Sequence, residues 1–190
     1  MQTNIKRAGL MLALALATSA CATAYGEIGG FLDDGVSADR LSGDTFRIRS
    51  RGNGMTEHGT IEDYALLRAA ETVRMHCMTH FVVLDGADRT EVSETVTPAE
   101  WVKTYEEKVV DGKKTRVETR TYRPESVSIS VRPGQDLVVR GLVVPNGAEA
   151  PDEAIAADEV LTYVGSRVKR KKDAPLPLFP ACPGLAVAAR

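Results

Sequence analysis

A strand–helix–strand pattern between residues 44 and 86 constrains the fold of this chain more than any other feature. In "DTFRIRSRGN", Phe46 and Ile48 alternate with arginines, which is typical of a strand with one buried face. "HFVVLDG" is a short apolar run that ends at Asp-Gly, and it predicts a second strand. A helix between two strands so close in sequence predicts a βαβ unit with a right-handed crossover and two parallel strands.

The segment between these strands, "TIEDYALLRAAETVRMHCM", predicts the helix. Thr60 can cap its N-terminus, and Asp63 three residues later can complete a capping box. On a 3.6-residue period one face carries small and apolar side chains. The members of this face are Ala65, Leu66, Ala69, Ala70, Val73 and Cys77. Its alanines predict that the helix lies close to a sheet.

Further strands, a hairpin and a second helix follow. Asp111-Gly112 lies between two polar arms and predicts a two-residue hairpin turn. Because the arms carry little apolar surface, we expect this hairpin to be exposed. The other predicted elements are a strand in "ESVSISVRPG" that buries Val127, Ile129 and Val131, a strand over residues 136–144, and a helix over residues 151–165.

Together these elements predict an α+β (or α/β) domain over residues 42–165. We expect a small mixed sheet that contains the βαβ unit, with one or two helices packed on one face and an exposed hairpin. Residues 166–190 read as a basic, Pro-rich C-terminal tail, which Cys182 could fasten to the domain.

The N-terminus has the pattern of a bacterial export signal over residues 1–20. Lys6 and Arg7 precede an apolar run that is too short to span a membrane. A lipoprotein peptidase would cut before Cys21 and leave it acylated, whereas an ordinary signal peptidase could cut after "ACA" or "ATA" and remove it. We expect residues 21–41, which are rich in Gly and Asp, to be a lipid anchor and spacer.

Several motifs together resemble a family of small lipoproteins of unknown function found mainly in alphaproteobacteria. They are "CATAYG", "GGF", "DTFRIRSRGNG", "EDYALLRAAE", "FVVLD" and "ADEVLTYVG". The resemblance spans Cys21 to Gly165 and implies acylation of Cys21, which would attach the chain to a membrane through its N-terminal lipid. Between Asp85 and Ser126 the chain departs from the family pattern, with a charged hairpin where many relatives carry a Tyr/Pro/Gly-rich insert. The family supplies no catalytic residues.

Either cleavage leaves Cys77 and Cys182 as the only candidates for a free thiol pair, because Cys21 is then either acylated or removed. In an oxidising periplasm this favours a disulfide over two separate thiols. The bridge would close a loop of roughly 105 residues, worth about 4–5 kcal/mol in the chain-entropy model.

The charge of the mature chain argues against nucleic-acid binding. Signal removal takes away Lys6 and Arg7 and no acidic residue, which leaves 22 Lys+Arg from the original 24 against 26 Asp+Glu, a net charge of −4. A mildly acidic chain lacks the basic footprint that a nucleic-acid partner requires.

The residues that could carry chemistry are few. "RMHCMTH" brings His76 and His80 to a helix end beside Cys77, but it offers no fourth ligand for zinc. We therefore expect surface histidines beside a structural cysteine, and no metal.

Arg51, Asn53 and Arg68 are the polar residues we would test first for a ligand, because we expect them at one end of the βαβ unit. The loop Arg51–His58 precedes a helix N-terminus, which can bind an anion. It lacks the P-loop and dinucleotide fingerprints, so its glycines more simply serve a tight turn.

These observations favour a non-catalytic cell-envelope lipoprotein with an interaction or structural role. The chain has no G-x-S-x-G motif and no histidine near a Gly-flanked serine, so we expect neither an enzyme nor a cofactor. Expected partners are an envelope protein, peptidoglycan or anionic lipid, the last through "RVKRKK". The alternative is a small-ligand or metal-binding periplasmic lipoprotein. Because Ala22 rather than aspartate follows Cys21, the retention rule suggests by analogy the periplasmic face of the outer membrane.

Overall fold

The computed structural model describes residues 22–29, 33–110, 113–172, 174 and 176–182 of the 190-residue chain. The predicted signal peptide, Cys21 and the Asp111-Gly112 turn lie outside these residues. Contacts along the chain define two units: a main unit, which runs up to Glu91 and resumes at Arg132, and a ribbon, Val92–Val131. No helix in the described ranges is both long enough and apolar enough to cross a membrane.

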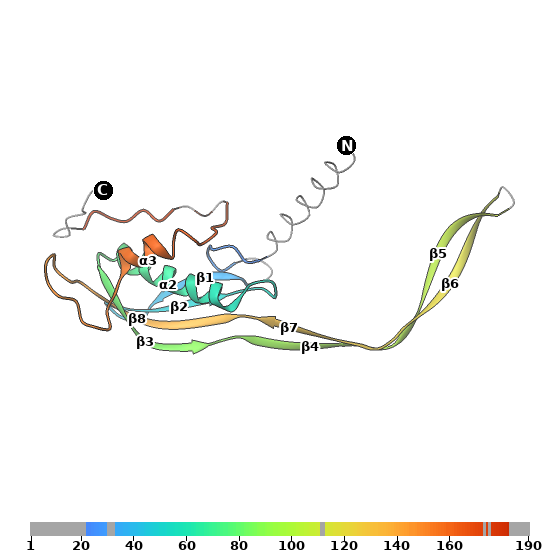
Figure 1. The fold of residues 1–190 in the computed structure, drawn as a ribbon, viewed down its shortest axis with the longest axis horizontal. Helices are drawn as coiled ribbons and strands as arrows, with labels where there is room; N and C mark the ends of the chain where they lie inside the picture. The colour runs from blue at the N-terminus through green and yellow to red at the C-terminus, as the bar shows by residue number, and fades with distance from the viewer. Residues whose placement is uncertain (1–21, 30–32, 111–112, 173, 175, 183–190) are drawn as a thin grey trace, which may run out of the picture. The chain divides into compact units, whose positions relative to one another are not determined.

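The main unit is built on a five-stranded antiparallel sheet in the order β1-β2-β8-β3-β9 (Figure 1). The strands are β1 (Gly35–Arg40), β2 (Thr45–Arg51), β8 (Gly134–Leu142), β3 (His80–Asp88) and β9 (Ile155–Ala156). Both β2 and β3 pair antiparallel with β8, so they run parallel to each other with β8 between them. The predicted strand–helix–strand unit is therefore present in a split form, and the predicted α+β class is confirmed.

Helix α2 (His58–Met75) packs against β1, β2, β8 and β3, and α3 (Ala157–Tyr163) packs against α2. The predicted cap at Thr60 is wrong, because the helix begins one turn earlier. Glu57 is the N-cap residue, and its carbonyl already accepts a hydrogen bond from the Thr60 N–H at 3.1 Å. The second helix is shorter than predicted because Ile155–Ala156 pairs with β3 as a short strand instead.

The core lies between the sheet and α2. Phe46 and Ile48 on β2 are buried, as their alternation with arginines predicts, and they meet Ala65, Ala69 and other small residues of α2 in one cluster. Small side chains let the helix approach the sheet closely. The space between them is therefore filled although the core contains few aromatic residues.

The C-terminal end of α2 carries the disulfide predicted from the cysteine count. Cys77 and Cys182 are bonded, with their Cα atoms 5.3 Å apart. Cys77 follows the helix in a left-handed conformation (φ 59°). The N–H of Met78 donates to the Val73 carbonyl at 2.9 Å and that of Cys77 to the Arg74 carbonyl at 3.1 Å, which is a Schellman ending.

The N-terminal segment differs from the expected spacer. Tyr25 is 2% exposed, and β1 is a full member of the sheet. The Tyr25 N–H donates to the Lys169 carbonyl at 2.9 Å, and the Lys171 N–H donates to the Tyr25 carbonyl at 2.8 Å. The start of the described chain thus pairs with the C-terminal tail, and both belong to the main unit rather than to flanking linkers.

The ribbon consists of two two-stranded sheets. Its strands are β4 (Glu91–Thr97), β5 (Glu100–Val110), β6 (Lys113–Arg123) and β7 (Ser126–Arg132). β5 and β6 pair in a register that leaves two residues for the turn, so the predicted hairpin arms are confirmed. The expectation that Val127, Ile129 and Val131 point inward is wrong. All three are exposed because β7 pairs with β4 and not with the five-stranded sheet.

Removing the disulfide should destabilise the main unit. We expect the double variant C77S/C182S to lose about 4–5 kcal/mol of unfolding free energy, because the closed loop no longer restricts the unfolded chain. Urea denaturation of the oxidised wild type and the double variant measures this loss.

A matched pair of variants tests the conformation of Cys77. C77G/C182S should be more stable than C77A/C182S by about 1–2 kcal/mol, because glycine tolerates a left-handed backbone and alanine does not. Equal stability of the two would contradict the Schellman ending.

Candidate functional site

The first described residues of the chain are fixed to the main unit through Thr23. Its N–H donates to Thr56 Oγ1 at 2.9 Å, and its hydroxyl donates to Asp34 Oδ2 at 2.9 Å. The same hydroxyl accepts from the Asn53 N–H at 3.0 Å, and the Thr23 carbonyl accepts from the Tyr64 hydroxyl at 2.8 Å. Four partners from different parts of the chain hold Thr23 in one position.

Tyr25 is the second fixed point of this segment. Its ring packs edge-on against Tyr64 with centroids 5.3 Å apart, and the Arg170 guanidinium lies 4.8 Å from its centroid. The Tyr25 hydroxyl donates to Glu71 Oε2 at 2.6 Å. Burial, together with the negative charge of Glu71, raises the pKa of Tyr25 far above its usual value. The phenol therefore remains a hydrogen-bond donor at any physiological pH.

Glu71 is a buried carboxylate, 2% exposed, on α2. It accepts hydrogen bonds from Tyr25 and from the Arg170 guanidinium, and Arg68 lies 3.8 Å away. Arg68 in turn pairs with Glu27. A buried charge without such partners would cost several kcal/mol, so Glu71 requires both chain ends in place.

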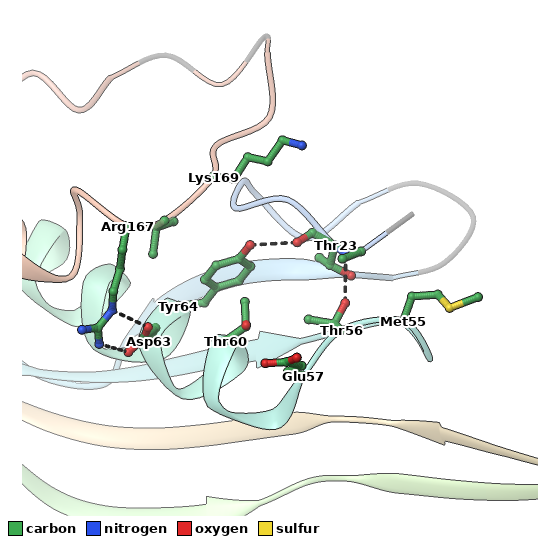
Figure 2. A pocket seen from close by; sticks show the side chains of 11 residues that line it. Thr23, Met55, Thr56, Glu57, Thr60, Asp63, Tyr64, Arg167 and Lys169 are labelled. Atoms are coloured by element: carbon green, nitrogen blue, oxygen red, sulfur yellow. Dashed lines mark hydrogen bonds and ion pairs between the residues drawn. The ribbon is translucent and has the colours of Figure 1, made fainter. Parts of the chain in front are cut away.

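A cleft of about 410 Å³ opens beside Thr23, at the N-terminal end of α2 (Figure 2). It lies between the N-terminal segment (Ala22, Thr23), the first turns of α2 (Thr60, Asp63) and the tail (Arg167, Lys169), with Met55 in the adjoining loop. Arg167 Nε donates to Asp63 Oδ2 at 2.7 Å and joins the tail to α2 along one side. Among the described residues that line this cleft there is no histidine or cysteine.

The three predicted ligand residues are not brought together. Arg51 lies on the sheet face away from α2, with its NH1 atom 2.7 Å from Asp136 Oδ1. Arg68 lies on α2, on the opposite side of the sheet. Asn53 holds its own turn, because its Oδ1 accepts from the Met55 N–H at 3.0 Å. Each has an interaction within the fold, so they form no shared ligand site.

The open face of the sheet carries a row of arginines on β2, namely Arg47, Arg49 and Arg51, and a groove of about 460 Å³ runs along them. Most guanidinium groups on this face meet carboxylates. The pairs are Arg49–Asp39, Arg51–Asp136, Arg89–Asp136 and Arg140–Asp44. Because three carboxylates offset most of this positive charge, the row is typical of a solvated sheet face rather than of a strong anion site.

The histidines are engaged locally. His76 Nδ1 lies 2.9 Å from the Thr72 carbonyl oxygen, and His80 Nδ1 lies 2.9 Å from Thr79 Oγ1. Cys77 is oxidised and cannot act as a thiolate ligand. Within the described part of the chain, no three His, Cys, Asp or Glu side chains come close enough to hold a metal ion.

One arrangement has the groups of a catalytic triad but not its geometry. His58 lies 3.4 Å from Thr90 Oγ1 and 3.5 Å from Glu62 Oε1. Both distances exceed a good hydrogen bond, and His58 and Glu62 are exposed. The long contact between His58 and Thr90 therefore lacks the hydrogen-bond geometry that would activate the threonine hydroxyl.

The ribbon presents a second candidate surface. In β5 and β6 the register places Trp101 opposite Tyr122, with ring centroids 5.2 Å apart. Tyr105, four residues after Trp101, lies on the same face of the hairpin. Arg116, six residues before Tyr122, lies on this face too, and its guanidinium stacks over the Tyr105 ring at 4.2 Å. Trp101 is 68% exposed. We call Trp101, Tyr105, Arg116 and Tyr122 the aromatic face.

No family model matches the chain, and no curated protein matches it significantly. The resemblance to the alphaproteobacterial lipoprotein family therefore stays a prediction, and so does acylation of Cys21.

Sequence reasoning missed Thr23, Tyr25 and Glu71. Two signals could have found them. Tyr25 is an aromatic residue among small ones in "CATAYG", and Glu71 shares a helix face with Tyr64 and Leu67. An acidic residue on a buried face requires a partner from elsewhere in the chain.

Replacing Tyr25 by phenylalanine should destabilise the main unit by about 1.5–3 kcal/mol, because the buried Glu71 loses the hydrogen bond from the Tyr25 hydroxyl.

The raised pKa of Tyr25 adds a pH dependence to this stability. Below the ordinary tyrosine pKa of about 10 its contribution is complete, and above that pH ionisation of the unfolded chain removes it progressively. Denaturation curves from pH 7 to 11 should show a shallower alkaline loss for Y25F than for wild type. Y163F, at an exposed tyrosine, is the control and should match wild type throughout.

Proposed function

We propose that this chain is a non-catalytic lipoprotein of the cell envelope, acylated at Cys21, that holds a protein partner through its ribbon. One observation carries the proposal: the ribbon exposes apolar and aromatic side chains but has no core. These side chains are Val92, Val96, Trp101, Tyr105, Val109, Tyr122, Val127, Ile129 and Val131. A two-stranded ribbon is marginally stable alone in water, so a surface of this kind is expected to be covered.

Three properties of the ribbon favour a protein partner. It carries equal numbers of basic and acidic residues, so it has no net charge to attract a polyanion. β5 and β6 pair only with each other, which leaves backbone donors and acceptors along their outer edges. A partner strand can pair with such an edge while the aromatic face receives its side chains.

The fixed position of Thr23 supports cleavage before Cys21. A cut after Ala24 would remove Thr23 and its four hydrogen bonds. A cut after Ala22 would turn the Thr23 nitrogen into a charged amine. Thr23 is only 5% exposed, and its N–H is hydrogen-bonded to Thr56. Burying that charge is costly. Of these three cuts, the one before Cys21 keeps every hydrogen bond of Thr23.

The absence of catalysis is part of the proposal. Among the described residues, no histidine or cysteine lines the cleft beside Thr23, and His76 and His80 contact a local backbone carbonyl and a hydroxyl group. With Ala22 after the acylated cysteine, we place the protein on the periplasmic face of the outer membrane.

Mass spectrometry of the membrane fraction tests the anchor. We expect a mature N-terminus at Cys21 that carries fatty acids, and a C21S variant that leaves the membrane fraction. A soluble wild-type species that begins at Thr23 or Tyr25 would contradict the proposal.

Site-specific photo-crosslinking tests the ribbon. A photoreactive phenylalanine in place of Tyr105 reports on the aromatic face, and the same group in place of Thr104 reports on the other face of β5. In intact cells we expect a discrete protein adduct at 105, and at least fivefold less at 104. Equal adducts at both positions, or none at either, would contradict a role for the aromatic face.

A further inference from the structure

A single residue, Ala22, separates the proposed lipid-bearing Cys21 from Thr23. Neighbouring Cα atoms are about 3.8 Å apart, so Cys21 lies within about 7.6 Å of the fixed Thr23. Diacylglycerol on Cys21 would hold that residue at the bilayer interface, where the headgroup layer is about 5–8 Å thick. With Thr23 held by four hydrogen bonds, there is no slack to lift the domain away.

We propose that this short link holds one particular surface of the main unit against the bilayer. We call it the anchor face, and it comprises Ala22, Met55, Glu57, Thr60, Arg167 and Lys169, which surround the cleft in Figure 2. The inference rests on the proposed acylation of Cys21 and deepens it, because it specifies how the lipoprotein is oriented.

The chemistry of the anchor face fits a lipid surface. Met55 is 72% exposed, an unusual position for an unbranched apolar side chain. Lys169 is exposed, and no ion pair within the described ranges involves it. An apolar side chain can enter the interface while a nearby lysine meets lipid phosphates.

The opposite end of the main unit supplies a matched control. Helix α2 has 18 residues and is therefore about 27 Å long, and the anchor face lies at its N-terminal end. Val143 comes directly after β8. Its neighbour Leu142 accepts a hydrogen bond from Thr79, which follows the C-terminal end of α2 by four residues. At 59% exposed, Val143 is comparable to Met55 in chemistry and accessibility.

Fluorescence quenching in vesicles tests this orientation. The single native tryptophan is removed with W101F, and an indole is introduced by M55W or by V143W. The acylated proteins are reconstituted in phosphatidylethanolamine–phosphatidylglycerol vesicles whose acyl chains are brominated near the headgroup. We expect at least threefold stronger quenching for M55W than for V143W. Oxidation of Cys77–Cys182 and the circular dichroism spectrum verify that both variants are folded.

A spacer variant tests the short link itself. Ten Gly/Ser residues inserted between Ala22 and Thr23 keep the cysteine and the residue after it, and reach about 17 Å on average. We expect them to reduce M55W quenching by half or more. Unchanged quenching would overturn the inference.

The outcomes separate this inference from the proposed function. If mass spectrometry shows acylated Cys21 and the M55W indole is quenched no more than V143W, the orientation is wrong and the lipoprotein proposal stands. If Cys21 carries no lipid, both fail.

Discussion

The carboxylate of Glu71 is the interaction on which the rest of the main unit depends. It is buried on α2, where Tyr25 and Arg170 both donate hydrogen bonds to it. One donor comes from the N-terminal segment and the other from the C-terminal tail. Because removal of one partner from a buried charge typically costs 3–5 kcal/mol, the folding of α2 and the placement of both chain ends are coupled.

The C-terminal tail contacts α2 at several points along its length. It contacts α2 first through Arg167 and Asp63, then at Glu71, and it ends at the disulfide between Cys182 and Cys77. The Arg74 guanidinium lies 6.0 Å from the ring of Phe179 on the way. The tail is thus held at intervals by charged and covalent contacts. In an exported protein, the disulfide would make this arrangement resistant to transient opening of either end.

Local patterns in the sequence predict local structure well here. The alternation around Phe46 and Ile48 predicts β2, the 3.6-residue period predicts α2, and Asp111-Gly112 predicts the pairing of β5 with β6. The pairing of Cys77 with Cys182 is predicted from the cysteine count and an expected oxidising compartment. Each of these predictions depends on residues that are close in sequence or on the number of cysteines, and a single sequence provides both.

The predictions fail where contacts between segments that are distant in sequence determine the structure. A Gly- and Asp-rich stretch reads as a spacer, yet Tyr25 is buried by residues 39 to 146 positions away. Alternating Val127, Ile129 and Val131 predict a buried face, but the pattern does not reveal that β7 pairs with β4 in a separate ribbon. Arg51 and Arg68 are expected at one end of the strand–helix unit, near the loop Arg51–His58. They lie on opposite sides of the sheet. The candidate site around Thr23 has only weak signals in the sequence, because its partners come from distant segments.

The central claim is that the residues after Cys21 belong to the fold. The most direct measurement compares the free energy of unfolding of a chain that begins at Ala22 with that of a chain that begins at Gly26. The second lacks Thr23 and Tyr25, so Glu71 loses a donor and α2 loses its cover. We predict a loss of about 3–5 kcal/mol, or failure to fold. Stabilities that agree within about 0.5 kcal/mol, the usual effect of surface changes, would show that the segment is a spacer after all.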